Sequence, residues 1–203
     1  MGLVALSVAC ASPATSETSD GEASSGGSSP TDASSTTEPQ TSADSSSTGL
    51  GSDPFLALSG CEETDFEPTP FLGSAFDPET GELLAPLEPP YVVAATAGWV
   101  TDKPEDAEAL GMQSQIVSED IFSHDGLIGV AFGGSDLCGS ARTLSIWEDE
   151  KSMWAFVFAS AHGEAMKLVP ARVAAWGTTH WTESESVEPP TFEDAHQRIV
   201  DAH

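Results

Sequence analysis

The chain has 203 residues, and its 33 acids against six bases give a formal net charge of −27 at neutral pH. Seven of the acids fall in residues 11–53, so the rest of the chain still carries a formal charge of −20, from 26 acids and six bases. So few cations cannot assemble a phosphate-neutralising surface, which excludes nucleic acid as a partner. The same charge disfavours anionic membrane surfaces as electrostatic partners.

Residues 1–10, MGLVALSVAC, are apolar and end on Cys10 with a small Ala9 before it. This stretch resembles the end of a bacterial lipoprotein signal peptide, although Leu6 lies one position too far upstream for the usual pattern. We expect a partial signal peptide here, with the true start upstream, and Cys10 as the lipid-bearing mature N-terminus. The protein would then be extracytoplasmic and lipid-anchored to a bacterial membrane, on the periplasmic side or at the cell surface. The alternative is a cytoplasmic protein in which Cys10 has no such role.

Residues 11–53 are about half Ser and Thr and contain no Lys, Arg, Trp, Phe or Tyr. Such a segment cannot bury enough apolar surface to offset its ordering entropy, so we expect a disordered acidic tether. Residues 54–90 are rich in Pro and acids but hold four Phe, which predicts an irregular strap lying on the domain. Cys61 in this strap and Cys138 form an even pair once Cys10 is lipidated, and we expect them to form a disulfide in an oxidising compartment.

The domain proper spans 91–203. Its first element is a strand over 91–100, followed by a helix opened by Asp102 and Pro104 that runs to about Phe122. A strand over 127–132 and a glycine-containing loop come next. A further strand ends at Trp147, a helix begins after the acidic stretch 148–150 and is ended by Pro170, and a last strand covers 172–181. The order β-α-β-β-α-β predicts an α+β, ferredoxin-like sheet with two helices on one face, and a short C-terminal helix over about 192–201 completes it.

The letters S-I-W-E-D-E, A-F-V and A-H-x-x-A-M, within residues 145–166, resemble the antibiotic-biosynthesis-monooxygenase-like group of the dimeric α+β barrel superfamily. The resemblance implies that helices cover one face of the sheet only, and that the open face closes against a second copy in a homodimer. It also implies a ligand cavity between sheet and helices. Some members of the superfamily bind haem through a helical His, and others oxidise aromatic substrates without a cofactor.

His162, in the matching A-H-x-x-A-M motif, is the candidate catalytic residue and the candidate haem ligand; the alternative is a packing histidine bonded to a main-chain carbonyl. Trp154 and Phe158 add a second apolar face to the same helix, which we expect to meet the strap or a partner chain. The separation of the cysteines and the spacing of the histidines do not match the patterns of zinc ligands. The candidate ligand-binding residues are Trp147, Trp176, His180 and Arg142, with core indoles and an ion pair as the alternatives.

Two functions therefore stay open. One is a surface-tethered lipoprotein whose monooxygenase-like domain binds a small hydrophobic ligand, with an unknown reaction. The other is a non-catalytic protein-interaction domain of a surface lipoprotein. A cavity between sheet and helices would favour the first function, and a filled interior would favour the second.

Overall fold

The computed structural model describes residues 53–203. The expectations for Cys10, for the signal peptide and for nearly all of the tether lie outside these residues. Among the helices of the described part, none combines the length and apolar character needed to cross a membrane.

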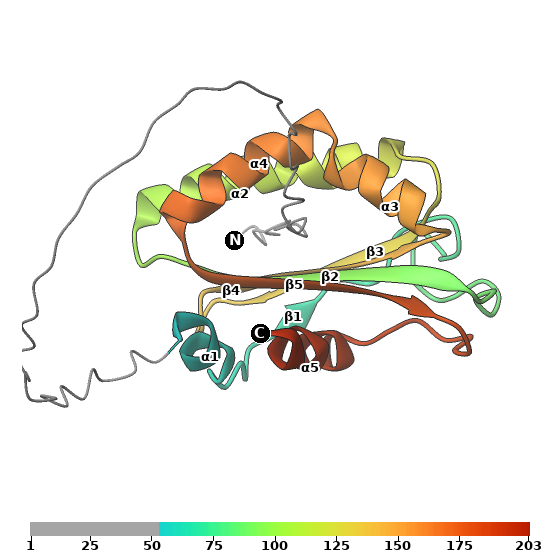
Figure 1. Ribbon diagram of the computed structural model, residues 1–203, viewed down its shortest axis with the longest axis horizontal. Helices are drawn as coiled ribbons and strands as arrows, with labels where there is room; N and C mark the ends of the chain where they lie inside the picture. Colours follow the sequence, from blue (N-terminus) through green and yellow to red (C-terminus); the bar gives the residue numbers. More distant parts are fainter. Residues whose placement is uncertain (1–52) are drawn as a thin grey trace, which may run out of the picture. The chain divides into compact units, whose positions relative to one another are not determined.

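The described chain forms one antiparallel sheet with helices on both faces (Figure 1). Its elements in chain order are α1 (Pro54–Ser59), β1 (Glu67–Pro68), β2 (Tyr91–Val100), α2 (Pro104–Asp120), the short 3-10 helix η1 (Ile121–Ser123), β3 (Leu127–Ser135), β4 (Ser140–Trp147), α3 (Glu150–Val157), α4 (Ser160–Arg172), β5 (Val173–Glu183) and α5 (Phe192–Ala202).

The strand order is β1-β3-β4-β2-β5, and every neighbouring pair is antiparallel. Strands β2 to β5, with α2 and the α3–α4 segment as crossovers, give the predicted ferredoxin-like α+β fold. Strand β2 lies in the interior of the sheet, and nine of its ten residues are buried. That pattern requires both faces of the sheet to be covered, because successive side chains of a strand point to opposite faces.

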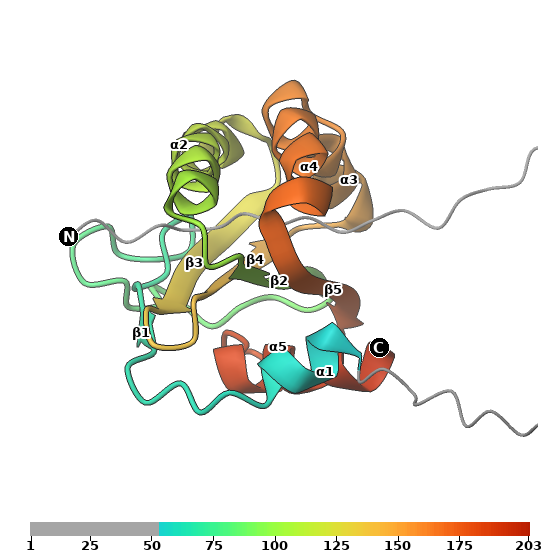
Figure 2. The same ribbon diagram turned by 90° about the vertical axis from the view of Figure 1, so that its left-hand side faces the viewer.

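One face is covered by α2, α3 and α4, as expected (Figure 2). The core on this side includes Val92 from β2, Val117 from α2, Trp147 from β4, and Met153 and Phe156 from α3. The helix predicted after residue 150 is broken in two, since α3 stops at Val157 and α4 begins at Ser160.

Some predicted boundaries differ from the structure. Pro170 does not end its helix but lies within the last turn of α4, which continues to Arg172; only one intrahelical N–H is lost there. Residue Lys103, not Asp102, occupies the N-cap position of α2, and no side chain caps it. Strand β3 continues to Ser135, beyond the predicted end at residue 132, because Gly134 pairs with Glu67 and Ser135 pairs with Ser140.

The second face of the sheet is closed by α1, α5 and the strap, all from the same chain (Figures 1 and 2). Phe55 of α1 and Phe76 of the strap are 2% and 3% exposed, and Ile199 of α5 packs in the same cluster. This corrects the expectation of an open sheet face. The strap supplies buried Phe side chains as expected, but it also contains the two short regular elements α1 and β1. The homodimer itself stays a prediction, and it can no longer use this face without displacing the cover.

Candidate functional site

His162 lies in the first turn of α4 and is only 1% exposed. Its Nδ1 donates to the carbonyl oxygen of Val157 at 2.6 Å, and its ring packs 5.0 Å from the ring of Phe156. Burial lowers the pKa of the imidazole, with the Val157 carbonyl opposing that shift, so the ring is held neutral. The residue therefore bridges the break between α3 and α4, which is the geometry of a structural histidine.

The four candidate ligand-binding residues do not converge on one place. Trp147 is fully buried, donates from Nε1 to Ser145 Oγ at 2.9 Å and stacks on Phe156. Trp176 and His180 share the helix-covered face of β5, four residues apart. Arg142 lies on the opposite face of the sheet.

Arg142 pairs with Glu63 of the strap at 2.5 Å, and both side chains are 10% exposed. The guanidinium lies 5.0 Å from the centroid of the Phe66 ring, a cation–π distance. Burial lowers the pKa of Arg142, and the charge of Glu63 opposes that change. Arg142 thus neutralises a buried acid and ties the strap to the sheet, one of the roles considered from the sequence.

The predicted disulfide between Cys61 and Cys138 is present and joins the strap to the β3–β4 hairpin. Asp65 reinforces this junction, because its carboxylate accepts from Ser135 Oγ and, at 2.9 Å, from the backbone N–H of Leu137. These hydrogen bonds, that of Ser135 first, lower the pKa of Asp65. The hairpin is therefore held to the strap by one covalent and one ionised contact.

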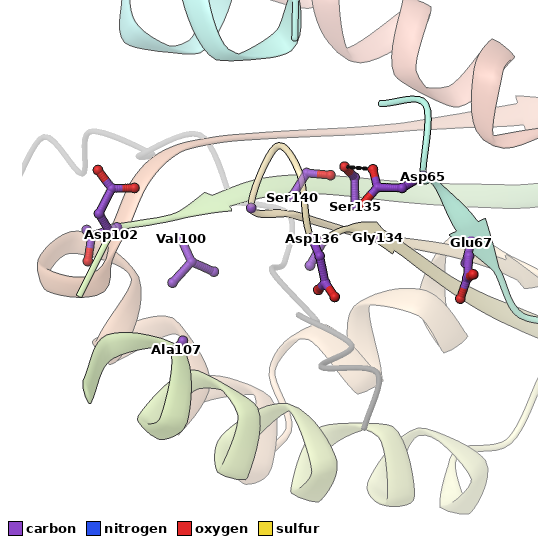
Figure 3. A pocket seen from close by; sticks show the side chains of 12 residues that line it. Asp65, Glu67, Val100, Asp102, Ala107, Gly134, Ser135, Asp136 and Ser140 are labelled. Atoms are coloured by element: carbon purple, nitrogen blue, oxygen red, sulfur yellow. Dashed lines mark hydrogen bonds between the residues drawn. The ribbon is translucent and has the colours of Figure 1, made fainter. Parts of the chain in front are cut away.

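A pocket of about 490 Å³ opens beside this junction, between the strap, the hairpin, the end of β2 and the start of α2 (Figure 3). In Figure 3, Asp102 lies at one end and Glu67 at the other, with Asp136 between them and Asp65, bonded to Ser135, above Asp136. Within residues 53–203 no three His, Cys, Asp or Glu side chains lie close enough to hold a metal ion. The pocket favours a cationic ligand over the flat apolar one that the sequence suggested.

Sequence reasoning missed this pocket because its four acids come from three separate stretches of the chain. Nothing in their spacing marks them, and the long-range pairing of β1 with β3 brings them together. The wall also includes backbone from the glycines of the hairpin; the lining residues are Asp65, Glu67, Val100, Thr101, Asp102, Ala107, Gly134, Ser135, Asp136, Gly139, Ser140 and Ala141.

Three aromatic rings form a surface patch at the end of α3, which we call the aromatic patch (Trp154, Phe158 and His180). Phe158 is 70% exposed and stacks on Trp154, with ring centroids 5.7 Å apart and planes at 21°. Trp154 in turn meets His180 of β5 edge to face at 5.4 Å. The strap does not cover this patch, since its cluster lies on the opposite face and β1 pairs at the far edge of the sheet. Of the two expected covers, a partner chain is the one left.

A scan against protein-family models finds no match for this chain, and a search of curated proteins also finds none. Among solved structures, a candidate monooxygenase from Fusobacterium nucleatum superposes with a TM-score of 0.42 at 14% identity, covering 53% of this chain and 52% of that one. The chain thus spans about half the length of that protein. SnoaB, a cofactor-independent oxygenase from Streptomyces nogalater, gives a TM-score of 0.38 at 11% identity, covering 49% of this chain and 98% of SnoaB. Rv0793 from Mycobacterium tuberculosis gives a TM-score of 0.43 at 10% identity, covering 48% of this chain and 99% of Rv0793. Similarity at this level carries no conclusion about activity, and the assignment of the fold rests on the strand order above.

Proposed function

We propose that the domain is the non-catalytic interaction module of a lipid-anchored extracytoplasmic protein, and that the aromatic patch is its contact surface. The observation that carries this proposal is the exposure of Phe158, stacked on Trp154 at the surface. Aromatic side chains are enriched where proteins meet, and a stacked pair presents a large, rigid area at little cost in side-chain entropy.

Three observations favour an interaction module over the binding of a small hydrophobic ligand. His162 donates a hydrogen bond from one ring nitrogen to the main-chain carbonyl of Val157, and burial keeps the ring neutral. Trp147, which would line a cavity between sheet and helices, is packed against Phe156 with its indole N–H already bonded. The acidic pocket holds carboxylates where an apolar ligand would need indoles.

The membrane anchor is supported by the sequence of residues 1–53 and by the disulfide, which suits an oxidising compartment. Expressed in a bacterium with a complete signal peptide, the protein should enter the membrane fraction, and Cys10→Ser should release it. Equal recovery of both proteins in membranes would refute lipidation at Cys10.

The contact surface is tested by placing a photo-crosslinking amino acid at position 158 and, as a matched control, at position 137. Leu137 is likewise exposed, at 67%, but lies in the β3–β4 hairpin. We expect a discrete cross-linked species in cells from position 158 and none from position 137. The proposal fails when position 158 gives no adduct, or when both positions give the same one.

A further inference from the structure

The two edges of the sheet differ in how well they are protected from pairing with a strand of another chain. At one edge β1 is only two residues long and carries Pro68, which cannot donate to a further strand. At the other edge β5 has eleven residues, and no described strand lies beyond it. Long edge strands tend to pair with another chain unless Lys, Pro, charge or a bulge prevents it.

Strand β5 largely lacks these protective features. In a chain with a large excess of acids, residues 174–182 contain no Asp, Glu, Lys, Arg or Pro. A bulge occurs only near its start, where the register shifts opposite Trp99 and Val100. From Ala175 to Glu183 the strand runs regularly against β2. A strand of the same composition could therefore approach this edge without facing a row of like charges.

We infer that the partner is a second copy of this chain, which pairs antiparallel along β5 about a twofold axis at Thr178. This deepens the proposed function by naming its partner, and so rests on it. In a twofold dimer the same surface of both copies forms the interface, so a charged residue near the axis would face its own copy. The absence of charged residues over 174–182 avoids that repulsion. The two sheets would join edge to edge, and the covered face of each would stay closed.

The aromatic patch is completed by this pairing. With Thr178 on the axis, His180 of each copy lies directly opposite Trp176 of the second copy. Directly opposed residues of antiparallel strands have Cβ atoms about 5 Å apart on the same face, within ring contact. The stack of Phe158, Trp154 and His180 would therefore continue onto an indole that is half-buried in its own chain.

The ends of the paired strands are compatible in charge. With the axis at Thr178, Glu183 at the end of β5 in one copy lies opposite Val173 at the start of β5 in the other, and Arg172, the last residue of α4, directly precedes Val173. Arg172 and Glu183 already have contacts within their own chain: Arg172 pairs with Asp106, and Glu183 accepts from the backbone N–H groups of the residues that follow it. Full overlap thus places no two charged residues of β5 opposite each other, and it leaves Arg172 one residue away from the position opposite Glu183.

The register is tested by cysteine cross-linking in the full chain carrying Cys10→Ser. Thr178→Cys places two thiols across the axis at a Cα separation of about 5 Å, within disulfide range. Thr182→Cys is the control, because the two copies of residue 182 would stand roughly 26 Å apart at 3.3 Å per residue. We expect a dimer that reductant dissolves from the first variant and none from the second. Equal cross-linking of both variants, or of neither, overturns the inference.

Sedimentation of the wild type, His180→Lys and Leu137→Lys tests the surface. We expect a dimer whose dissociation constant rises at least tenfold with His180→Lys, because lysine on an edge strand opposes pairing, and is unchanged by Leu137→Lys. A wild type that stays monomeric at every accessible concentration overturns the inference. A monomer that still gives an adduct from position 158 would leave the proposed function standing with a different partner, whereas loss of that adduct would end both.

Discussion

The ring of Phe55 lies directly over the backbone of Gly177, so closely that a Cβ built on this glycine would stand 2.6 Å from Phe55 Cε2. The same Cβ would stand 2.5 Å from Ile199 of α5. Helices from the two ends of the domain thus meet over one residue of β5, and the absence of a side chain there is what lets them approach.

We predict that Gly177→Ala is destabilising, by about 1–3 kcal/mol, because α1 and α5 must move away from the sheet. Gly163→Ala is the matched control, since it lies in α4 and its added Cβ meets nothing within 4 Å. The control should be neutral or stabilising, by up to about 1 kcal/mol, as expected for Gly to Ala in a helix. Urea unfolding of both variants measures this; a neutral Gly177→Ala would contradict the close packing.

Reduction of the Cys61–Cys138 bond should weaken the fold. The two cysteines are 77 residues apart in sequence, and loop-closure entropy gives an upper estimate of roughly 4 kcal/mol. The free energy of unfolding of the double Cys→Ser variant, measured in urea against wild type with and without reductant, checks this. Wild type under reductant should match the variant. Two titratable thiols beyond Cys10 in unreduced, unfolded protein would refute the bond.

Removing one partner of the buried ion pair should lower the free energy of unfolding more than removing both partners. Arg142→Met leaves the Glu63 carboxylate buried without its cation, and loss of a buried partner costs about 3–5 kcal/mol. The double variant Arg142→Met with Glu63→Met should recover much of this loss, since apolar side chains can replace such a pair. A double-mutant cycle in urea measures the difference. Additive losses in the double variant would mean that the two side chains do not depend on each other.

The stability of the domain should fall as the pH drops below about 6.5, the ordinary pKa of histidine. Burial lowers the pKa of His162 in the folded state, so the unfolded chain binds the proton first as the pH falls. Protonation therefore stabilises the unfolded state relative to the folded one. His162→Gln should remove this part of the slope and cost about 1–3 kcal/mol at neutral pH through the lost bond to Val157. The steeper loss at lower pH, where carboxylates such as Asp106 with lowered pKa take up protons, should persist in the variant. Identical profiles for the two proteins would argue against a neutral buried His162.

Haem should bind neither wild type nor His162→Ala, because Nδ1 already holds Val157 and the ring is 1% exposed. Titration followed by absorbance near the Soret band measures this directly. Binding by wild type that is lost in His162→Ala would restore the haem-ligand hypothesis. Pro170→Ala, elsewhere in α4 and away from the ring, provides a control for general loss of folding.

Over residues 91–203 the sequence was sufficient for the order of strands and helices, apart from the break between α3 and α4, because periodicity and cap residues are local signals. The disulfide also followed from the sequence, since only two cysteines remain after Cys10. The cover formed by α1 and α5 did not, because whether an amphipathic helix packs on its own sheet or on a partner is decided by tertiary contact. The resemblance in residues 145–166 pointed to an open face, and it said nothing about segments outside the shared domain.

The candidate site was less predictable than the fold. Trp176 and His180 share a strand face, as their spacing indicates, but Trp147 and Arg142 lie in places that only the sheet register determines. The break between α3 and α4 was also invisible to helical periodicity. It leaves Phe158 at the C-cap of α3, where the ring projects from the surface instead of continuing a buried stripe.

The closure of the second sheet face by α5 has a further consequence for a dilute protein. Residues 184–191 connect β5 to this helix, so its local concentration over the sheet is fixed by a short connection, on the order of millimolar for flexible linkers. A face closed by a separate subunit would be bared whenever that subunit dissociated. Here the core stays sealed at any protein concentration, and two copies joined along β5 could separate without exposing it.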